Sequence, residues 1–315
     1  MPGTIVTFYS YKGGVGRSML LANVAAILAM NGQRVLAVDW DLEAPGLHQY
    51  FRPFLTEPDL QHTEGVIDLV SDFAIRAVSN DPAGIAAEAD FDILQYASSL
   101  RFDFAPDATL DFLPAGRLDR HYGSRVNSFD WGVFYERIGG GHFLEAVKRS
   151  MRESYDYTLI DSRTGLSDVS GICTIQMPDT VVMCCTLNTQ SINGTAGVAR
   201  SIRAQRPDLT ILPVPSRVDN AERQMYVERV ANLQAKLGWL MEPFAGTSLD
   251  DLAVPYTPSY AYEEVLAALV APPGDRFVSA VERLTFVLTQ GRVGKATLIS
   301  PRDRAFVRER FREHG

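Results

Sequence analysis

Short apolar runs alternate along this chain with segments whose apolar residues recur at helical spacing. The apolar runs predict strands over residues 4–10, 34–39, 93–96, 110–114, 157–161, 180–186 and 210–215. The helical spacing predicts helices over residues 18–30, 141–153, 193–204, 220–236, 262–270 and 275–289. Strands that are apolar on both faces and alternate with helices are typical of a parallel sheet covered on both sides. We therefore expect an α/β fold with a doubly wound, mostly parallel sheet flanked by helices.

The stretch from about residue 50 to residue 137 is the least regular part of this pattern. It contains Pro53, Pro58, Pro82 and Pro106 and many aromatic residues. Charged and apolar residues are mixed there, which favours a folded region over a disordered one. We therefore expect this region to be folded.

A glycine-rich turn joins the first expected strand to the first expected helix. Its residues are Tyr11, Lys12, Gly13, Gly14, Val15, Gly16 and Arg17, and Ser18 follows at the start of the helix. Such a turn aims consecutive backbone N–H groups at one point, and the helix N-terminus adds positive partial charge, so the turn can cradle a phosphate group. The Ser18 hydroxyl is placed to bind Mg²⁺. We therefore expect the run from Lys12 to Met19 to bind a nucleotide.

Two of the expected strands end in carboxylates. The strand over 34–39 runs into Asp39-Trp40-Asp41, and the strand over 157–161 ends at Asp161. Ligands of an open parallel sheet bind beyond the carboxyl ends of its strands, which is also where the glycine-rich turn must lie. These carboxylates predict a metal site beside the phosphates, with helix capping or a turn as the alternative for Asp39 and Asp41.

The run from Lys12 to Gly16 resembles the deviant phosphate loop of the MinD/ParA ATPases, which carry a second lysine five residues before the usual one. The usual lysine is Arg17 here, which keeps the charge but changes its shape. Residues 39–46, 110–116, 161–165 and 254–258 are similar to further segments of that family. The resemblance extends over about residues 3–290 and implies a P-loop nucleotide-binding domain. Compared with a minimal member of that family, the domain is expected to be enlarged at about residues 50–137, with a surface for a partner there.

This resemblance also implies a role for each site residue, in a site that takes ATP and Mg²⁺. Ser18, Asp39 and Asp161 would serve the metal, and Asp41 would position the attacking water. Lys12 would reach the phosphates of a second subunit in a face-to-face homodimer. Lys12, Asp41 and Arg17 therefore form the expected catalytic set, with hydrolysis slowed by the arginine.

The resemblance assigns further residues around this site. Arg217 and Pro255 would contact the base. GTP-binding relatives have Asn-Lys-x-Asp at residues 216–219, a pattern that Arg217 and Asp219 loosely match and Ser216 does not. ATP is favoured over GTP because the MinD/ParA ATPases normally bind ATP with a related segment. Gly165 would be a hinge that responds to the γ-phosphate. Arg163 stands where the family usually has proline, so both a contact with the γ-phosphate and a salt bridge with a neighbouring acid stay open.

Three functions fit these motifs. The first is an ATP-dependent dimerisation switch that regulates or positions a partner protein. The second is a nucleotide-binding sensor or adaptor with little or no hydrolysis, in a signalling or bacterial conflict system. The third is a ligase of the same superfamily, which is disfavoured because the strong motifs are all used for nucleotide and metal.

Composition and charge add limits to this interpretation. The net charge of -8 argues against nonspecific DNA binding by the whole surface. The cysteines at 173, 184 and 185 have neither disulfide nor metal-site spacing and are expected in the core. Without a signal peptide or an apolar run of about 20 residues, the protein is expected in the cytoplasm.

The end of the chain is expected to differ from the rest. Residues 1–290 would form the nucleotide-binding domain, and residues 291–315 would form a basic tail whose last part has helical spacing. Packing of this tail on the parent domain is favoured, and docking on a membrane or on nucleic acid is the alternative.

Overall fold

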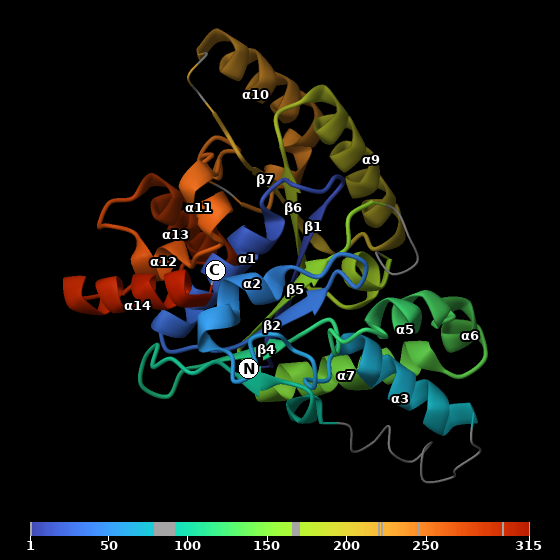
Figure 1. The fold of residues 1–315 in the computed structure, drawn as a ribbon. Coiled ribbons are helices and arrows are strands. Elements are labelled where there is room, and N and C mark those ends of the chain that lie inside the picture. Colours follow the sequence, from blue (N-terminus) through green and yellow to red (C-terminus); the bar gives the residue numbers. More distant parts are fainter. Residues whose placement is uncertain are drawn as a thin grey trace.

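The computed structural model describes residues 2–78, 92–165, 171–219, 221, 223–244, 246–297 and 299–314. Within these residues, seven strands form one sheet in the order β3-β4-β2-β5-β1-β6-β7 (Figure 1). The strands are β1 (Thr4–Ser10), β2 (Arg34–Trp40), β3 (Ser98–Ser99), β4 (Thr109–Leu113), β5 (Tyr157–Ser162), β6 (Thr180–Cys185) and β7 (Thr210–Pro215). Neighbouring strands are parallel except β3 and β4. The predicted doubly wound, mostly parallel sheet is confirmed.

Helices cover both faces of this sheet (Figure 1). The α-helices are α1 (Arg17–Met30), α2 (Leu47–Phe51), α3 (Val66–Val78), α5 (Tyr122–Ser128), α6 (Trp131–Glu136), α7 (Gly140–Ser154), α9 (Thr189–Gln205), α10 (Arg223–Leu237), α11 (Pro258–Glu263), α12 (Ala267–Val270), α13 (Arg276–Leu288) and α14 (Pro301–His314). The short helical segments are η1 (Arg52–Phe54), η2 (Ile93–Gln95), η3 (Ile172–Gln176) and η4 (Gly238–Met241).

The alternation of side chains along the central strands divides the core between the two faces. On β1, Val6 and Phe8 pack in one cluster with residues of α1, α9 and α13, whereas Ile5 packs in the other with residues of α3 and α7. Helix α1 is buried along almost its whole length, and its alanines allow close packing between the sheet and α13. The helix that follows the glycine-rich turn is therefore held rigidly in the middle of the domain.

One predicted strand, over 93–96, is wrong. The segment forms the 3-10 helix η2, because the Asp92 side chain accepts a hydrogen bond from the N–H of Leu94 (2.9 Å) and caps the turn. The N–H of Ile93 donates to the Ser150 hydroxyl (3.0 Å) instead of to a strand. Strand β3, which was not predicted, is only two residues long and consists of serines.

The predicted continuous helix over 262–270 is also wrong. Glu264 adopts a left-handed backbone conformation (φ 47°), which no α-helix accommodates, so the chain ends α11 and begins α12 a few residues later. The helix predicted over 220–236 begins at Arg223, and Asn220 lies outside the described residues.

The irregular region contains helices that the sequence pattern did not predict, namely α2, α3, α5 and α6. Helix α3 places Val66, Ile67 and Val70 in the second core cluster. Residues 79–91, which include Pro82, lie outside the described residues. The expected partner surface of this region stays a prediction.

The C-terminal helix α14 packs on the domain, as favoured from the sequence. Val307 and Phe311 are buried in the first core cluster, and the Phe311 ring meets the Phe54 ring edge-on at 5.7 Å. Arg308 also donates a hydrogen bond from Nη2 to the carbonyl of Val270 (2.9 Å). The apolar side of α14 is therefore covered by the protein itself, except for the exposed Phe306.

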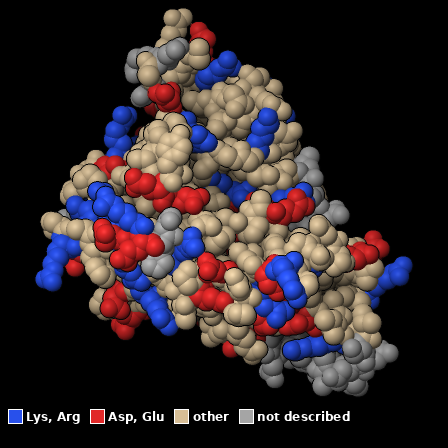
Figure 2. All heavy atoms as spheres, viewed as in Figure 1, with Lys and Arg blue, Asp and Glu red and all other residues tan. Residues whose placement is uncertain are grey.

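Two other sequence predictions concern the surface and the core. The three cysteines are free and buried, as expected for small core residues. Among the described helices, none is long and apolar enough to cross a membrane. Figure 2 shows Lys and Arg interspersed with Asp and Glu over the visible face, in keeping with the net charge of -8.

Candidate functional site

The glycine-rich turn lies at the centre of the sheet's carboxyl edge. It leaves β1, which is flanked by β5 and β6, and enters α1 at Arg17. Gly14 (φ 73°) and Gly16 (φ 84°) adopt left-handed backbone conformations that favour glycine. This arrangement puts the turn next to the ends of β5 and β2, where the sequence placed the carboxylates.

A cavity of about 390 Å³ opens in front of the turn. Eight of the predicted site residues line it, namely Gly13, Gly14, Val15, Gly16, Arg17, Ser18, Met19 and Asp41, together with Ser10, Glu43, Ala44, Tyr50, Arg163 and Thr164. Lys12, Asp39 and Asp161 lie near the cavity without lining it. The structure therefore brings the loop and the carboxylates of β2 and β5 together around one space.

Arg17 does not point into this space as a free cation. Its Nε donates to Asp161 Oδ1, and its Nη2 donates to Asp41 Oδ2 (2.9 Å). Burial alone would lower the pKa of Arg17, but the charges of Asp161 and Asp41 outweigh burial and raise it. The side chain is 7% exposed, so this is a buried ion-pair network.

Three buried polar atoms at this site have no hydrogen-bond partner among the described residues. They are Ser10 Oγ, Arg17 Nη1 and Asp161 Oδ2. Buried polar groups are almost always paired, so unpaired ones at a cavity indicate where a ligand would bond. Arg17 Nη1 suits an anionic oxygen, and Asp161 Oδ2 suits a cation or a water molecule bound to one.

Asp39 holds the turn that follows β2. Its Oδ1 accepts from the N–H of Asp41 (3.2 Å), and its Oδ2 accepts from the N–H groups of Gly46 and Leu47 (3.1 Å each). Burial and the charge of Asp161 raise the pKa of Asp39 well above its usual range, against the opposing hydrogen bond from Leu47. These contacts are those of a residue that stabilises a turn, which was the alternative to a metal ligand for Asp39. A metal role for Asp39 stays a prediction.

Ser18 and Asp161 fit a magnesium ion better than Asp39 does. Burial raises the pKa of Asp161, whereas Arg17 and the Ser18 hydroxyl oppose this rise. Within the parts of the chain that are described, no group of three His, Cys, Asp or Glu residues could hold a metal ion unaided. Mg²⁺ normally takes only one or two protein carboxylates, with water and phosphate oxygens as its other ligands. The hydroxyl of Ser18 and the unpaired oxygen of Asp161 suit such a site.

Contacts at the rim of the cavity bear on the other predictions. Lys12 donates from Nζ to the side chain of Gln190 in the first turn of α9. Arg163 forms an ion pair with Glu43 (Nη1–Oε1 2.5 Å). Of the two possibilities left open for Arg163, this contact is the salt bridge with a neighbouring acid. Gly165 (φ 81°) accepts a hydrogen bond on its carbonyl from the Tyr9 hydroxyl (3.1 Å), and its hinge role stays a prediction.

The two segments that are expected to contact the nucleotide base lie against the glycine-rich turn. Arg217 donates from Nη1 to the carbonyl of Gly14 (2.6 Å), and its guanidinium carbon lies 4.4 Å from the centre of the Tyr256 ring. Val218 pairs with Pro255 in an isolated bridge that joins the two segments. Arg217 and Pro255 line a narrow crevice of about 50 Å³ that Tyr256 and Tyr50 also line. Tyr50 was missed, whereas Tyr256 lies within the predicted segment 254–258 but was not assigned a role of its own.

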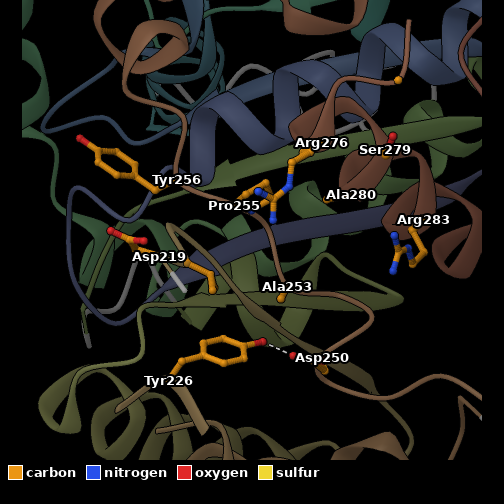
Figure 3. A pocket seen from close by; sticks show the side chains of 12 residues that line it. Asp219, Tyr226, Asp250, Ala253, Pro255, Tyr256, Arg276, Ser279, Ala280 and Arg283 are labelled. Atoms are coloured by element: carbon orange, nitrogen blue, oxygen red, sulfur yellow. Dashed lines mark hydrogen bonds between the residues drawn. The ribbon is translucent and has the colours of Figure 1, made fainter. Parts of the chain in front are cut away.

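A second cavity, of about 380 Å³, lies on the other side of Pro255 and Tyr256. Figure 3 shows Arg276 and Arg283 of α13 on one wall and the hydrogen-bonded Tyr226 and Asp250 on another. None of the residues of the glycine-rich turn lines it. This cavity was not predicted from the sequence.

Comparisons with known proteins agree with this geometry. The model of the family described as the CobQ/CobB/MinD/ParA nucleotide binding domain matches residues 6–246. The septum site-determining protein MinD of Pyrococcus horikoshii, solved with Mg-ADP, superposes with a TM-score of 0.62 at 19% identity, over 91% of this chain and 96% of that one. The MinC:MinD cell division protein complex of Aquifex aeolicus gives a TM-score of 0.57 at 17% identity, over 95% and 99%.

A curated relative matches only locally. The putative tyrosine-protein kinase EpsB of Ralstonia nicotianae is 55% identical over 38 residues, which are 12% of this chain and 5% of the relative. The structural matches cover almost the whole chain, and the family model covers most of it. The chain belongs to the CobQ/CobB/MinD/ParA family of nucleotide-binding domains.

Proposed function

We propose that this chain is a MgATP-binding ATPase that acts as a slow, nucleotide-dependent dimerisation switch and positions or regulates a partner protein. The observation that carries the proposal is the meeting of the glycine-rich turn with Asp41 and Asp161 around one cavity. The relative from Pyrococcus horikoshii was solved with Mg-ADP, and the one from Aquifex aeolicus as a complex with another protein, which agrees with both parts of the proposal.

Each residue of the site has a distinct part in this mechanism. The backbone N–H groups of residues 13–18 bind phosphate oxygens, assisted by the N-terminus of α1. Ser18 and Asp161 would hold Mg²⁺, which would supply positive charge to the phosphates. Asp41 lines the cavity and orients the attacking water.

Adenine fits the base segment better than guanine. GTP-binding relatives use an aspartate at the position of Asp219 to accept hydrogen bonds from the base. Here Asp219 Oδ1 accepts from the N–H of Ala221 (3.0 Å), within its own turn. Asp219 also lines the second cavity rather than the crevice beside the turn. ATP is therefore the proposed nucleotide.

Lys12 is proposed to act on the second subunit. It lies at the rim of the cavity, and its contact with Gln190 holds it away from the space that the turn encloses. A lysine in that place can meet phosphates presented by another copy of the chain. ATP would then join two subunits, and hydrolysis would release them.

A second function is favoured by the position of Arg17. Because its guanidinium is bonded to Asp41 and Asp161, the carboxylate that would orient water is engaged. A protein with this contact can bind nucleotide and change its association state with negligible turnover. That behaviour would make it a sensor or adaptor in a signalling or bacterial conflict system.

Calorimetry tests the binding that both functions share. Mg²⁺-dependent binding of ATP is expected, weaker in Ser18→Ala and lost in Gly16→Asp, which puts a carboxylate among the phosphate-binding N–H groups. Gly32→Asp is the matched control, because Gly32 also has a left-handed conformation (φ 78°) but ends α1 far from the turn. Equal ATP affinity of the wild type and Gly16→Asp would exclude the proposed site.

Turnover and oligomeric state separate the two functions. Phosphate release is measured beside gel filtration, each with ATP, with ADP and without nucleotide. An ATP-dependent dimer with measurable turnover supports the switch. Nucleotide binding without turnover supports the sensor, and a monomer under all conditions at micromolar concentration excludes the dimerisation mechanism.

A further inference from the structure

Arg17 is the residue on which the charges of this site converge. It connects the ends of β2 and β5, because one guanidinium nitrogen bonds Asp41 and another bonds Asp161. We call Arg17, Asp41 and Asp161 the carboxylate clamp. The third guanidinium nitrogen of Arg17, Nη1, is buried and has no partner among the described residues, although the cavity lies beside it.

The other cations at the rim do not replace Arg17 in this network. Lys12 is bonded to Gln190, and Arg163 is paired with Glu43. Asp41 and Asp161 are both buried, and a buried carboxylate that loses its only counter-ion is strongly destabilised. The guanidinium therefore stays on the two carboxylates unless another cation takes its place.

The geometry of the clamp requires an arginine. A guanidinium is a rigid planar fork, so it can bond two carboxylates through different nitrogens and keep a third nitrogen for an anion. A lysine carries one compact ammonium on a flexible chain and can follow a phosphate away from the carboxylates. At position 17 the two side chains have the same charge but different effects on Asp41.

We propose that Arg17 is a positioning residue that restrains hydrolysis by holding Asp41 on the clamp, while its unpaired Nη1 donates a hydrogen bond to a phosphate oxygen. The bond from Arg17 fixes the direction of the Asp41 carboxylate and engages one of its two oxygens, so the carboxylate cannot turn freely toward a water in the cavity. The nucleotide is then retained and turned over slowly until Asp41 is released. This inference rests on the proposed function, because it gives Asp41 the water-orienting role.

Arg17→Lys tests this proposal through two measurements, kcat and the rate of ADP dissociation. A residue with only a structural role would not raise both. In this variant kcat should rise by at least about tenfold, a part of the 10²–10⁴ that a positioned proton acceptor contributes. The dissociation rate of a fluorescent ADP analogue should rise as well, because Nη1 is lost. Arg34→Lys is the matched control, since Arg34 also bonds an aspartate, Asp156, through two nitrogens but stands at the opposite end of β2.

A measurement on the wild type adds a readout that does not depend on activity. Arg17 engages one oxygen of Asp41 and one of Asp161, so without nucleotide Mg²⁺ can reach only Asp161 Oδ2 and the Ser18 hydroxyl. Two protein ligands without phosphate oxygens hold Mg²⁺ weakly, so millimolar Mg²⁺ should shift the melting temperature by less than about 1 °C. Arg17→Gln, which vacates the carboxylates, should be stabilised by Mg²⁺. A clear Mg²⁺ shift in the wild type overturns the clamp, even if Arg17→Lys does not fold.

The failures of the two proposals can be told apart. If the wild type binds no nucleotide, the proposed function fails. If it binds nucleotide but Arg17→Lys has unchanged or lower kcat and unchanged ADP release, only the clamp is refuted. A rise in kcat in Arg34→Lys of the same size would also refute it, because that change leaves Asp41 untouched.

Discussion

Replacement of Asp39 by asparagine should destabilise the protein most in acid, and this loss of stability should become smaller as the pH rises. Asp39 is fully buried, and its oxygens accept three backbone N–H groups, from Asp41, Gly46 and Leu47. Asparagine has the same shape but only one accepting oxygen, so its amide must face at least one N–H group. Asp39→Asn therefore loses hydrogen bonds and gains relief from a buried charge.

The two effects have different pH dependence. Leaving a buried donor unsatisfied costs about 1–3 kcal/mol at any pH. Burial and the charge of Asp161 raise the pKa of Asp39 above the value of 3.8 that it has in an exposed position. Between these two pKa values the folded protein binds more protons than the unfolded chain, so its stability falls as the pH rises.

The free energy of unfolding of the wild type minus that of Asp39→Asn should therefore be largest in acid. It should then decrease by up to about 1.4 kcal/mol for each pH unit as the pH rises through that window. Taking the difference between two proteins cancels the titration of the carboxylates that do not interact with Asp39. The repulsion between Asp39 and Asp161 is absent in Asp39→Asn, and its loss acts in the same direction as the titration of Asp39 itself. Urea unfolding at several values between about pH 4.5 and about pH 7 measures it, without nucleotide or metal.

Asp156→Asn is the matched control for this experiment. Despite partial burial, which acts in the opposite direction, the hydrogen bond from Arg34 lowers the pKa of Asp156. Its stabilising effect is lost only as the pH falls through that lowered pKa, so the corresponding difference should be constant over the measured range. A difference for Asp39→Asn that is also constant, or that rises with pH, would mean that Asp39 is ionised throughout and that its burial has been misjudged.

Three further predictions concern hydrolysis, the dimer and the tail. Asp41→Ala should lower kcat with ATP binding retained, by the full factor of about 10²–10⁴ in the Arg17→Lys background and by less in the wild type, where Arg17 restrains Asp41; normal turnover in both would remove Asp41 from its role. Mixing Lys12→Ala with Asp41→Ala subunits should restore part of the phosphate release, whereas no recovery would refute action of Lys12 across the dimer. Phe311→Ala should lower the free energy of unfolding by about 3 kcal/mol in urea, because the Phe311 ring packs on Phe54; an unchanged urea midpoint would contradict the packing of α14. Because that packing covers the apolar side of α14, the wild type should show no ATP-dependent binding to liposomes in a flotation assay.

The central sheet and the phosphate-binding turn could be predicted because their signals are local. Each buried strand is a continuous apolar run, and the turn needs glycine at Gly14 and Gly16, where the backbone is left-handed. Asp41 and Asp161 could be predicted because each follows or ends an apolar strand, and parallel strands end at the same edge of the sheet. The segment over 93–96 failed because an apolar run of four residues does not reveal that Asp92 caps a helical turn.

The contacts that decide the chemistry were not predictable from the sequence. Arg17 was expected to face phosphate, but the direction of its side chain depends on two carboxylates that lie 24 and 144 residues away in the chain. The salt bridge of Arg163 could be offered only as an alternative, because its partner Glu43 comes from another strand end. Tyr256 and Tyr50 acquire their position beside the turn only through tertiary packing.

The arginines around the nucleotide cavity share one property that bears on how phosphate would bind. Arg17 is bonded to Asp41 and Asp161, Arg163 is paired with Glu43, and Arg217 is bonded to the carbonyl of Gly14. The carboxylates therefore compensate most of the charge of Arg17 and Arg163 before any ligand arrives, whereas the carbonyl of Gly14 only fixes the direction of Arg217. Phosphate affinity must then come mainly from the backbone N–H groups of the turn and from Arg17 Nη1. Because these groups are fixed by the fold, they favour retention of the nucleotide over fast chemistry on it.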